Sequence, residues 1–408
     1  MSDRSRTTPP VAEAQLAEEP SKVATWGLLS AYGSYQSYYE TTMLPDTPTD
    51  KIAWIGTIQG VLLIMGGIIT GPIYDRGHVR ELLVAGTLLT VLGVMMLSLA
   101  TEYYQIMLAQ GWCVGIGSGI LYTPSIATVA ATFGPRHRAL AVSLATSGTA
   151  VGGILYPVIF VRLLPSLGFA WTTRVLGFVT LAGLLVALPI ILPSATKARS
   201  TAAVAGKARM LFDLTALKEP IFSVFCFALF FMWVAYWVPF FLIPTFAEFA
   251  LGASGPWAFH LLVITNAATL PGRLFAVFII QRIGVSGGML ACAAASALVL
   301  YAWLAVHSMA GFEAWIVMLG VVMAPLAVFF PAIIPQMCPS REVIGARMGI
   351  GSAAAALGVI LGAPLGSALV DLEKAEFWRM EVFIGTCMAV GAVLMTYVWW
   401  QLRRQLPK

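Results

Sequence analysis

One arginine stands inside a long apolar stretch of this sequence. Arg273 is the only Lys, Arg, Asp or Glu between residues 256 and 280. If this stretch is a membrane-spanning helix, a charge near its centre costs about 3 kcal/mol unless it faces a polar cavity. Arg273 is therefore our first candidate for a residue that binds an anion. Arg273 could instead brace a backbone carbonyl of a neighbouring helix, or lie nearer the membrane surface.

Aromatic and amide side chains supply the other candidate binding residues. The aromatic residues of 23–39 and 220–244 recur every three or four positions, so one stripe of each helix could line a cavity. Aromatic residues at such positions can instead anchor a helix at the lipid headgroups. The candidates are Tyr32, Tyr35, Gln36, Trp233, Tyr236 and, ahead of Arg273, Asn266.

Acidic groups that could carry a proton across the membrane are scarce in this sequence. No Asp or Glu lies in the middle of an apolar stretch, and proton coupling usually needs a buried titratable group. His260 is the only candidate for that role, although a histidine in its position is more often an interfacial hydrogen-bonding residue. Protons remain a candidate coupling ion.

Enzyme and metal chemistry are not indicated. No apolar stretch carries paired acids, histidine clusters or a Ser–His arrangement that could do acid–base or nucleophilic work. The five cysteines lack the spacing of a metal site or a disulfide framework. We therefore expect no enzyme, no metal, no cofactor and no disulfide.

Composition indicates which elements hold these residues. The chain of 408 residues is 59% hydrophobic and 11% charged, with a mean hydropathy of +0.85. This excludes an ordinary soluble domain and predicts an all-α membrane protein whose main partner is the lipid bilayer. The net charge of +5 is concentrated in particular loops, so it serves membrane topology and indicates no nucleic-acid partner.

Twelve apolar stretches approach the roughly 20 residues that a spanning helix needs. They are 23–39, 51–72, 81–101, 106–132, 139–161, 170–193, 220–244, 256–280, 286–307, 314–337, 346–370 and 380–402. The expected organisation is a disordered tail 1–22, a six-helix bundle 23–193, a linker 194–219, a second six-helix bundle 220–402 and a tail 403–408. Most of the 24 Lys and Arg residues fall in the tails and in the loops on their side, which predicts that both termini are cytoplasmic.

A basic cluster followed by small residues marks the start of the fifth stretch. The residues of this pattern are Phe133, Arg136, Arg138, Leu140, Ala141, Ala145, Gly148 and Gly152. They resemble the start of the fifth helix in fungal and animal members of the monocarboxylate-transporter branch of the major facilitator superfamily. Gly148 and Gly152 form a small-xxx-small face, which predicts close helix packing. A generic Gly/Ala-rich helix after a basic loop is the alternative.

The segment 71–80 is similar to the loop between the second and third helices of the same superfamily. Its acid could accept hydrogen bonds from a helix N-terminus, and its bases could pair with acids across the cytoplasmic face. Arg347 and Arg138 open equivalent helices of the two halves, as expected for two repeats around a central cavity. The candidate conformational latch is Gly71, Asp75, Arg76, Arg80, Arg136, Arg138 and Arg347. A solvated basic loop is the alternative.

The resemblance implies a twelve-helix major facilitator fold that works as a monomer in the plasma membrane. It also implies secondary transport of a small organic solute, either a monocarboxylate-like anion or a secondary metabolite, by rocking of the two halves. Thr269 replaces the acid that accompanies the buried arginine in animal carriers, which favours export. The first helix looks shortened, which supports a second hypothesis: a non-transporting membrane sensor built on a transporter scaffold.

Overall fold

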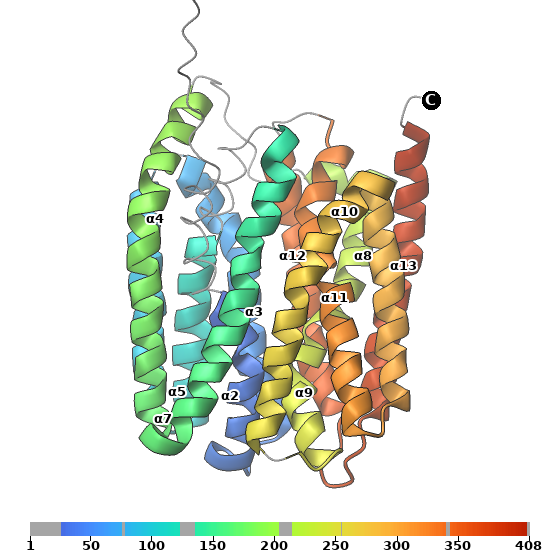
Figure 1. Cartoon of the computed structure of the whole chain (residues 1–408). Coiled ribbons are helices and arrows are strands. Elements are labelled where there is room, and N and C mark those ends of the chain that lie inside the picture. The colour runs from blue at the N-terminus through green and yellow to red at the C-terminus, as the bar shows by residue number, and fades with distance from the viewer. Residues whose placement is uncertain are drawn as a thin grey trace, which may run out of the picture.

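The computed structural model describes residues 26–75, 78–122, 135–203, 214–253, 255–339 and 343–405. Within these ranges the chain is almost entirely helical, and the only β-type pairing is an isolated bridge between Asp371 and Glu376. The helices run side by side as one elongated bundle (Figure 1). The expectation of an all-α fold is confirmed.

The N-terminal part of the bundle combines short helical segments with long helices. A short helical segment at residues 26–30 comes first and precedes the labelled helices. They are α2 (Tyr32–Tyr38) with its π-helical continuation η1 (Tyr39–Met43), α3 (Thr49–Asp75), α4 (Val79–Leu97), α5 (Tyr103–Ile106) with the π-helical η2 (Met107–Val114), and α7 (Pro135–Ala203).

The C-terminal part follows after the linker. Its helices are η3 (Leu214–Lys218), α8 (Pro220–Tyr236), α9 (Val238–Phe249), α10 (Gly255–Ala302), η4 (Trp303–Ala305), α11 (Met309–Ile333), η5 (Ile334–Met337), α12 (Ile344–Ala368) and α13 (Trp378–Gln405).

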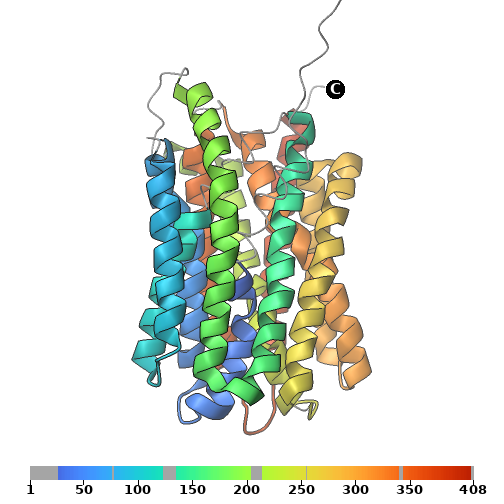
Figure 2. The ribbon, with the colours of Figure 1, turned by 60° about the vertical axis from the view of Figure 1, so that its left-hand side comes forward.

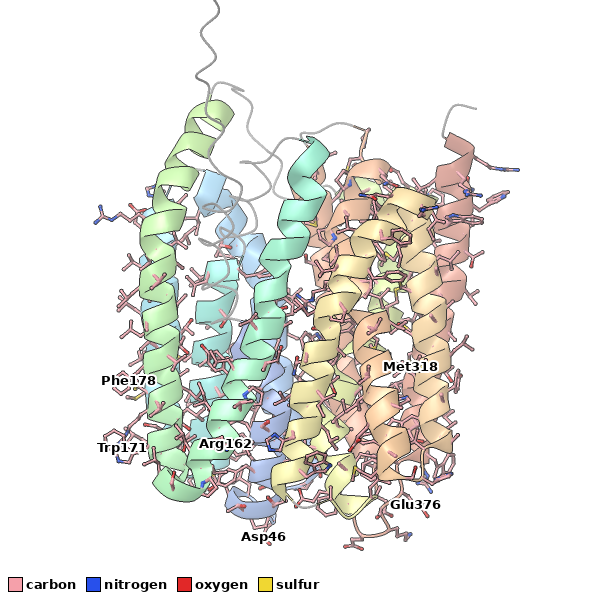
Figure 3. The ribbon with its side chains drawn as sticks, in the orientation of Figure 1. Asp46, Arg162, Trp171, Phe178, Met318 and Glu376 are labelled. Carbon is pink, nitrogen blue, oxygen red and sulfur yellow. The ribbon has the colours of Figure 1, made fainter. Side chains whose placement is uncertain are left out.

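Two of these helices reverse direction at a glycine. In α7 the turn is at Gly168 (φ 69°), and in α10 it is at Gly284 (φ 78°), so each element consists of two helices in sequence. Both glycines adopt the left-handed region that side chains with a Cβ atom disfavour. The gaps predicted between 161 and 170 and between 280 and 286 fall at these turns. We call the end of the bundle with the Gly168 turn, Asp46 and Glu376 the lower end, and the end with the C-terminus the upper end (Figures 1 and 3).

Eight helices of the described part are long and apolar enough to cross a membrane. Two of them, Gly148–Leu188 and His260–Ala305, contain the glycine turns and are much longer than one crossing requires. Apolar side chains such as Trp171, Phe178 and Met318 project outward from the bundle (Figure 3), and each is more than half exposed. This surface suits contact with lipid, so the chain is a multi-pass membrane protein. The predicted total of twelve crossings stays a prediction.

Glycines allow several helices to approach closely. A Cβ atom added to Gly27 would lie 2.8 Å from the Cα atom of Gly152, so the first helical segment packs directly against α7 at the predicted small-residue face. Gly148 is buried on the same helix. Gly66 of α3 meets Gly119 in the same way, where an added Cβ atom would lie 2.6 Å from the backbone.

In the described part of the chain, the two halves meet mainly through α2 with α9, α3 with α12, and α7 with α10. The ring of Tyr32 in α2 lies 4.8 Å from that of Phe241 in α9. On α3, an added Cβ atom at Gly60 would lie 3.6 Å from Val359 of α12. The view in Figure 2 shows α7 and α10 adjacent. The candidate binding residues on α2, α8 and α10 therefore lie near the boundary between the halves.

Candidate functional site

Arg273 is buried in the first arm of α10. Its side chain is 8% exposed, and its charge interacts with the phenol groups of Tyr236 and Tyr122. Tyr236 ends α8 in the C-terminal half, whereas Tyr122 belongs to the N-terminal half. The buried guanidinium thus lies within electrostatic range of a tyrosine from each half.

Aromatic rings surround these two tyrosines. Tyr122 packs 5.3 Å from Trp26, which stacks at 5.7 Å on Trp237. Trp237 lies 5.3 Å from Tyr236, and Tyr236 stacks at 5.5 Å on Trp233. We call these five residues (Trp26, Tyr122, Trp233, Tyr236 and Trp237) the aromatic cluster. Aromatic faces next to a cation favour flat, electron-rich ligands, because such ligands can stack while they pair with the charge.

A break in the helix places Tyr236 and Trp237 in the cluster. Trp237 separates α8 from α9, and Pro239 occupies the first turn of α9. Proline has no N–H group to donate to the preceding turn, so the backbone hydrogen-bond ladder is interrupted here. The sequence predicted one apolar stretch from 220 to 244 with a proline at position 239, and the structure divides this stretch into α8 and α9 at Trp237.

Two indole groups of the cluster keep free donors. Within the described residues, the buried Nε1 atoms of Trp26 and Trp237 have no hydrogen-bond acceptor. A buried donor without an acceptor costs about 1 to 3 kcal/mol. A ligand that brings an acceptor oxygen between these rings would remove this cost.

Asn266 lies two turns before Arg273 on the same face of α10. Its Nδ2 atom donates to the Leu262 carbonyl at 3.0 Å. A side chain at Gly153 of α7 would overlap with its amide, so Asn266 packs against the opposite half. The structure therefore gives this residue a role in the contact between the halves, and its role in substrate binding stays a prediction.

The candidates on α2 have different neighbours. The Tyr32 hydroxyl donates to the Ile52 carbonyl of α3 at 2.5 Å. Tyr35 packs 4.4 Å from Phe160 of α7, and Gln36 donates to Glu40 at 2.9 Å. The structure thus joins Trp233 and Tyr236 to Arg273, while Tyr32, Tyr35 and Gln36 make contacts elsewhere. A small void lies beside Tyr35, lined by Leu28, Gln59, Val94, Leu97, Gln110 and Val114.

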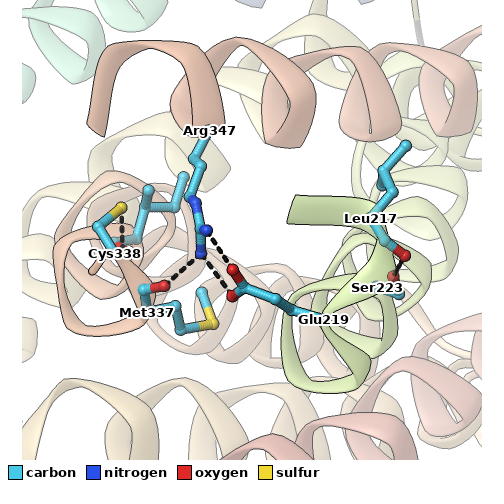
Figure 4. A network of polar contacts seen from close by, with 7 residues as sticks. Leu217, Glu219, Ser223, Met337, Cys338 and Arg347 are labelled. Atoms are coloured by element: carbon cyan, nitrogen blue, oxygen red, sulfur yellow. Dashed lines mark hydrogen bonds and ion pairs between the residues drawn. The ribbon is translucent and has the colours of Figure 1, made fainter. Parts of the chain in front are cut away.

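Arg347 forms an ion pair with Glu219 (Figure 4). Glu219 is the N-cap residue of α8, and α8 lies above α9 in Figure 1, so the pair is at the upper end. The Nη1 atom of Arg347 donates to Glu219 Oε2 at 2.7 Å, its Nη2 atom donates to Oε1 of the same carboxylate, and Nη1 also donates to the Met337 carbonyl. The Arg347 side chain is 1% exposed, and that of Glu219 is 42% exposed. Both residues belong to the C-terminal half, so this pair connects α12 to the start of α8 within one half.

The other latch candidates are described only in part. Gly71 and Asp75 lie in the last turns of α3, and Arg80 is exposed in the first turn of α4. Arg136 and Arg138 lie in the first turn of α7, but their side chains are outside the described part, as is Arg76 altogether. Their role as a latch stays a prediction.

Three acids whose carboxylates accept hydrogen bonds were not predicted from the sequence. Glu219, Glu40 and Glu248 lie at or beyond the ends of predicted spans, where acids usually contact water. Glu219 is the partner of Arg347. Glu40 has one local signal, since Gln36 precedes it by one helical turn and can hydrogen-bond to it.

Comparison with known proteins supports the fold and the class. The family model described as Major Facilitator Superfamily matches residues 24–285. MFS-type transporter dbaD of Emericella nidulans is 34% identical over 380 residues, which cover 91% of this chain and 82% of that protein. Aspyridones efflux protein apdF of the same organism is 30% identical over 371 residues, covering 91% of this chain and 74% of that protein.

Solved structures agree with this result at the level of the fold. The crystal structure of a peptide transporter POT superposes with a TM-score of 0.71 at 15% sequence identity. The match covers 97% of this chain and 95% of the other.

Proposed function

Because this chain belongs to the Major Facilitator Superfamily and is a multi-pass membrane transporter rather than an enzyme, we propose that it exports a small aromatic organic anion. The similarity to a protein named for aspyridones efflux supports export of a secondary metabolite. We further propose that the chain is most similar in function to the monocarboxylate-transporter branch, on the strength of the residues around Gly148 and Gly152.

The environment of Arg273 carries this proposal. A buried guanidinium can hold a carboxylate or enolate through charge-assisted hydrogen bonds. The aromatic cluster offers faces for a ring, and its two indole donors offer partners for further oxygen atoms. A neutral, purely aliphatic solute could neither pair with the charge nor stack on the rings, so the site selects against it.

The location of the site suits alternating access. Arg273, Trp233, Tyr236 and Trp237 belong to the C-terminal half, whereas Trp26 and Tyr122 belong to the N-terminal half. Rocking of residues 23–193 against residues 220–402 would therefore open and close the site between them. In our proposal the protein works as a monomer in the plasma membrane, with both termini in the cytoplasm.

Transport by reconstituted vesicles tests this function. We expect wild-type protein to move aromatic carboxylates such as benzoate derivatives, and Arg273→Gln to reduce flux at least tenfold while the protein remains in the membrane. The matched control is Arg282→Gln, which removes an exposed charge from the same helix and should leave flux unchanged. Equal flux in wild type and Arg273→Gln would refute the site.

The second hypothesis is a sensor that binds the same solute without moving it. The same vesicles separate the two functions, because binding can be followed by quenching of tryptophan fluorescence from the aromatic cluster. Binding without flux under any ion gradient would favour the sensor.

A further inference from the structure

Two carboxylates meet across the boundary of the halves at the lower end. Glu40 lies in η1, just beyond the predicted span 23–39, and Glu248 lies near the end of α9. We propose that this pair is a proton-binding site that takes up a proton when the lower end closes. The proposal rests on the transport function above and adds to it a proton that controls one step of the cycle.

Each carboxylate accepts a hydrogen bond from the opposite half. The Thr245 hydroxyl of α9 donates to Glu40 Oε2 at 2.9 Å. The Ser37 hydroxyl of α2 donates to Glu248 Oε2 at 3.2 Å. Gln36 supports Glu40 from its own helix, with 2.9 Å between Nε2 and Oε1. The pair therefore forms part of the contact that closes the lower end.

Close backbone packing holds the two carboxylates near each other. A Cβ atom on Gly33 of α2 would overlap with the Phe240 carbonyl of α9. Tyr32 and Phe241 pack beside this contact, with 4.8 Å between their ring centres. Movement of α2 away from α9 would separate the carboxylates, so their distance depends on the state of the lower end.

The surroundings of Glu40 favour a neutral carboxyl group. Within the described residues, neither Glu40 nor Glu248 forms a salt bridge. Burial raises the pKa of Glu40 to about 7; the hydrogen bonds from Gln36 and Thr245 act in the opposite direction, and the charge of Glu248 adds a smaller upward contribution. The phenol of Tyr32 on the same helix also interacts with Glu40. The elements around the pair contribute further ionisable groups, none of which is joined to either carboxylate by a described salt bridge: Asp50 and Lys51 of α3, Arg162 of α7 and His260 of α10.

The direction of the effect follows from these contacts. Burial and the nearby negative charge of Glu248 both disfavour the charged form of Glu40, so closing the lower end takes up a proton on Glu40. Opening it exposes the pair to water, where a carboxyl group has its ordinary pKa of about 4, so the proton is released at any pH above that value. Proton uptake on closing is therefore expected at a pH between about 4 and about 7, the pKa of buried Glu40. An acidic medium at the lower end therefore favours its closure after the solute has left. The empty carrier then returns more readily to the form that is open at the upper end. The rate of export should therefore depend on the pH at the lower end.

A distance measurement tests the proton site without any solute. Spin labels on cysteines introduced at Thr42 of η1 and Leu251, after α9, would report the separation of the two elements in protein whose native cysteines have been replaced. We expect the separation to be larger at about pH 8 than at about pH 6. Glu40→Gln and Glu248→Gln, which imitate the protonated form, should keep the short distance at both values.

Transport provides the second measurement. In vesicles, wild-type flux should rise when the pH at the lower end falls from about 8 to about 6, and Glu40→Gln should transport solute at a rate that no longer depends on this pH. Glu376→Gln is the control, since this acid lies at the same end and forms its bridge with Asp371 through backbone atoms. A wild-type distance that ignores pH, or a Glu40→Gln variant that keeps the pH response, would overturn the proton site. Absence of flux in wild type with a pH-dependent distance would count against the transport function alone.

Discussion

The two ends of the bundle are held by different kinds of contact. At the lower end, hydrogen bonds from Thr245 to Glu40 and from Ser37 to Glu248 connect the two halves. At the upper end, the described ion pair of Arg347 with Glu219 connects two helices of the same half. The lower contacts must break whenever the halves separate there, whereas the upper pair can persist through the whole cycle. We therefore expect the upper pair to determine stability and the lower contacts to determine the conformational equilibrium.

Removal of Glu219 should have the largest effect. Glu219→Ala leaves the buried guanidinium of Arg347 without its carboxylate. Because Glu219 is 42% exposed, solvent screens the pair and the cost should be below the roughly 3 kcal/mol of a fully buried pair. We expect a lower unfolding temperature in detergent, with little change in the distance across the lower end. Lys218→Ala, an exposed neighbour, is the control. A clear change in that distance in Glu219→Ala would contradict the idea that the upper pair determines stability alone.

Enlarging Gly33 should act on the lower end instead. In Gly33→Ala the added methyl group meets the backbone of Phe240, which cannot turn aside, and overpacking of this kind costs about 1 to 3 kcal/mol in the closed form. The variant should unfold near the wild-type temperature but label faster at an exposed cysteine placed at Thr42. The matched control is Gly349→Ala, where the added atom would lie 3.9 Å from Ile68. Identical labelling of Gly33→Ala and wild type would contradict the assignment.

Loss of a single hydrogen bond across the halves should have the smallest effect. Thr245→Val keeps the shape of the side chain and removes the donor to Glu40, which is worth about 1 kcal/mol, or roughly a fivefold shift toward the open lower end. The distance between labels at positions 42 and 251 measures this shift. In Thr396→Val, which loses only a bond within α13, we expect none.

Local composition was enough to predict the features that depend on it. Apolar length predicted the membrane helices, and loop residues predicted the reversals that the structure places at Gly168 and Gly284. Arg273 could be singled out because a charge in an apolar stretch is conspicuous, and the structure buries its side chain. Gly152 was predicted to pack closely, although only the structure identifies Gly27 as its neighbour.

The partners of these residues could not be predicted in the same way. Glu219 and Arg347 are separated by 128 positions, and nothing local to either indicates the other. Helical spacing placed Tyr32, Tyr35 and Tyr236 each on one face of its helix. The spacing does not tell which neighbouring helix packs against that face. Glu40 was overlooked because the ends of apolar stretches usually lie in water, whereas here the meeting of α2 and α9 removes that water.

The break at Trp237 divides one apolar stretch into two helices, α8 and α9, which carry residues of different sites. The upper piece, α8, keeps Trp233 and Tyr236 beside Arg273, while the lower piece, α9, carries Thr245 and Glu248. A bend at this joint would let α9 swing outward while α8 stays in place. The lower end would then open before the anion leaves its binding residues. Release would occur in two stages, and both would depend on the bend at Trp237.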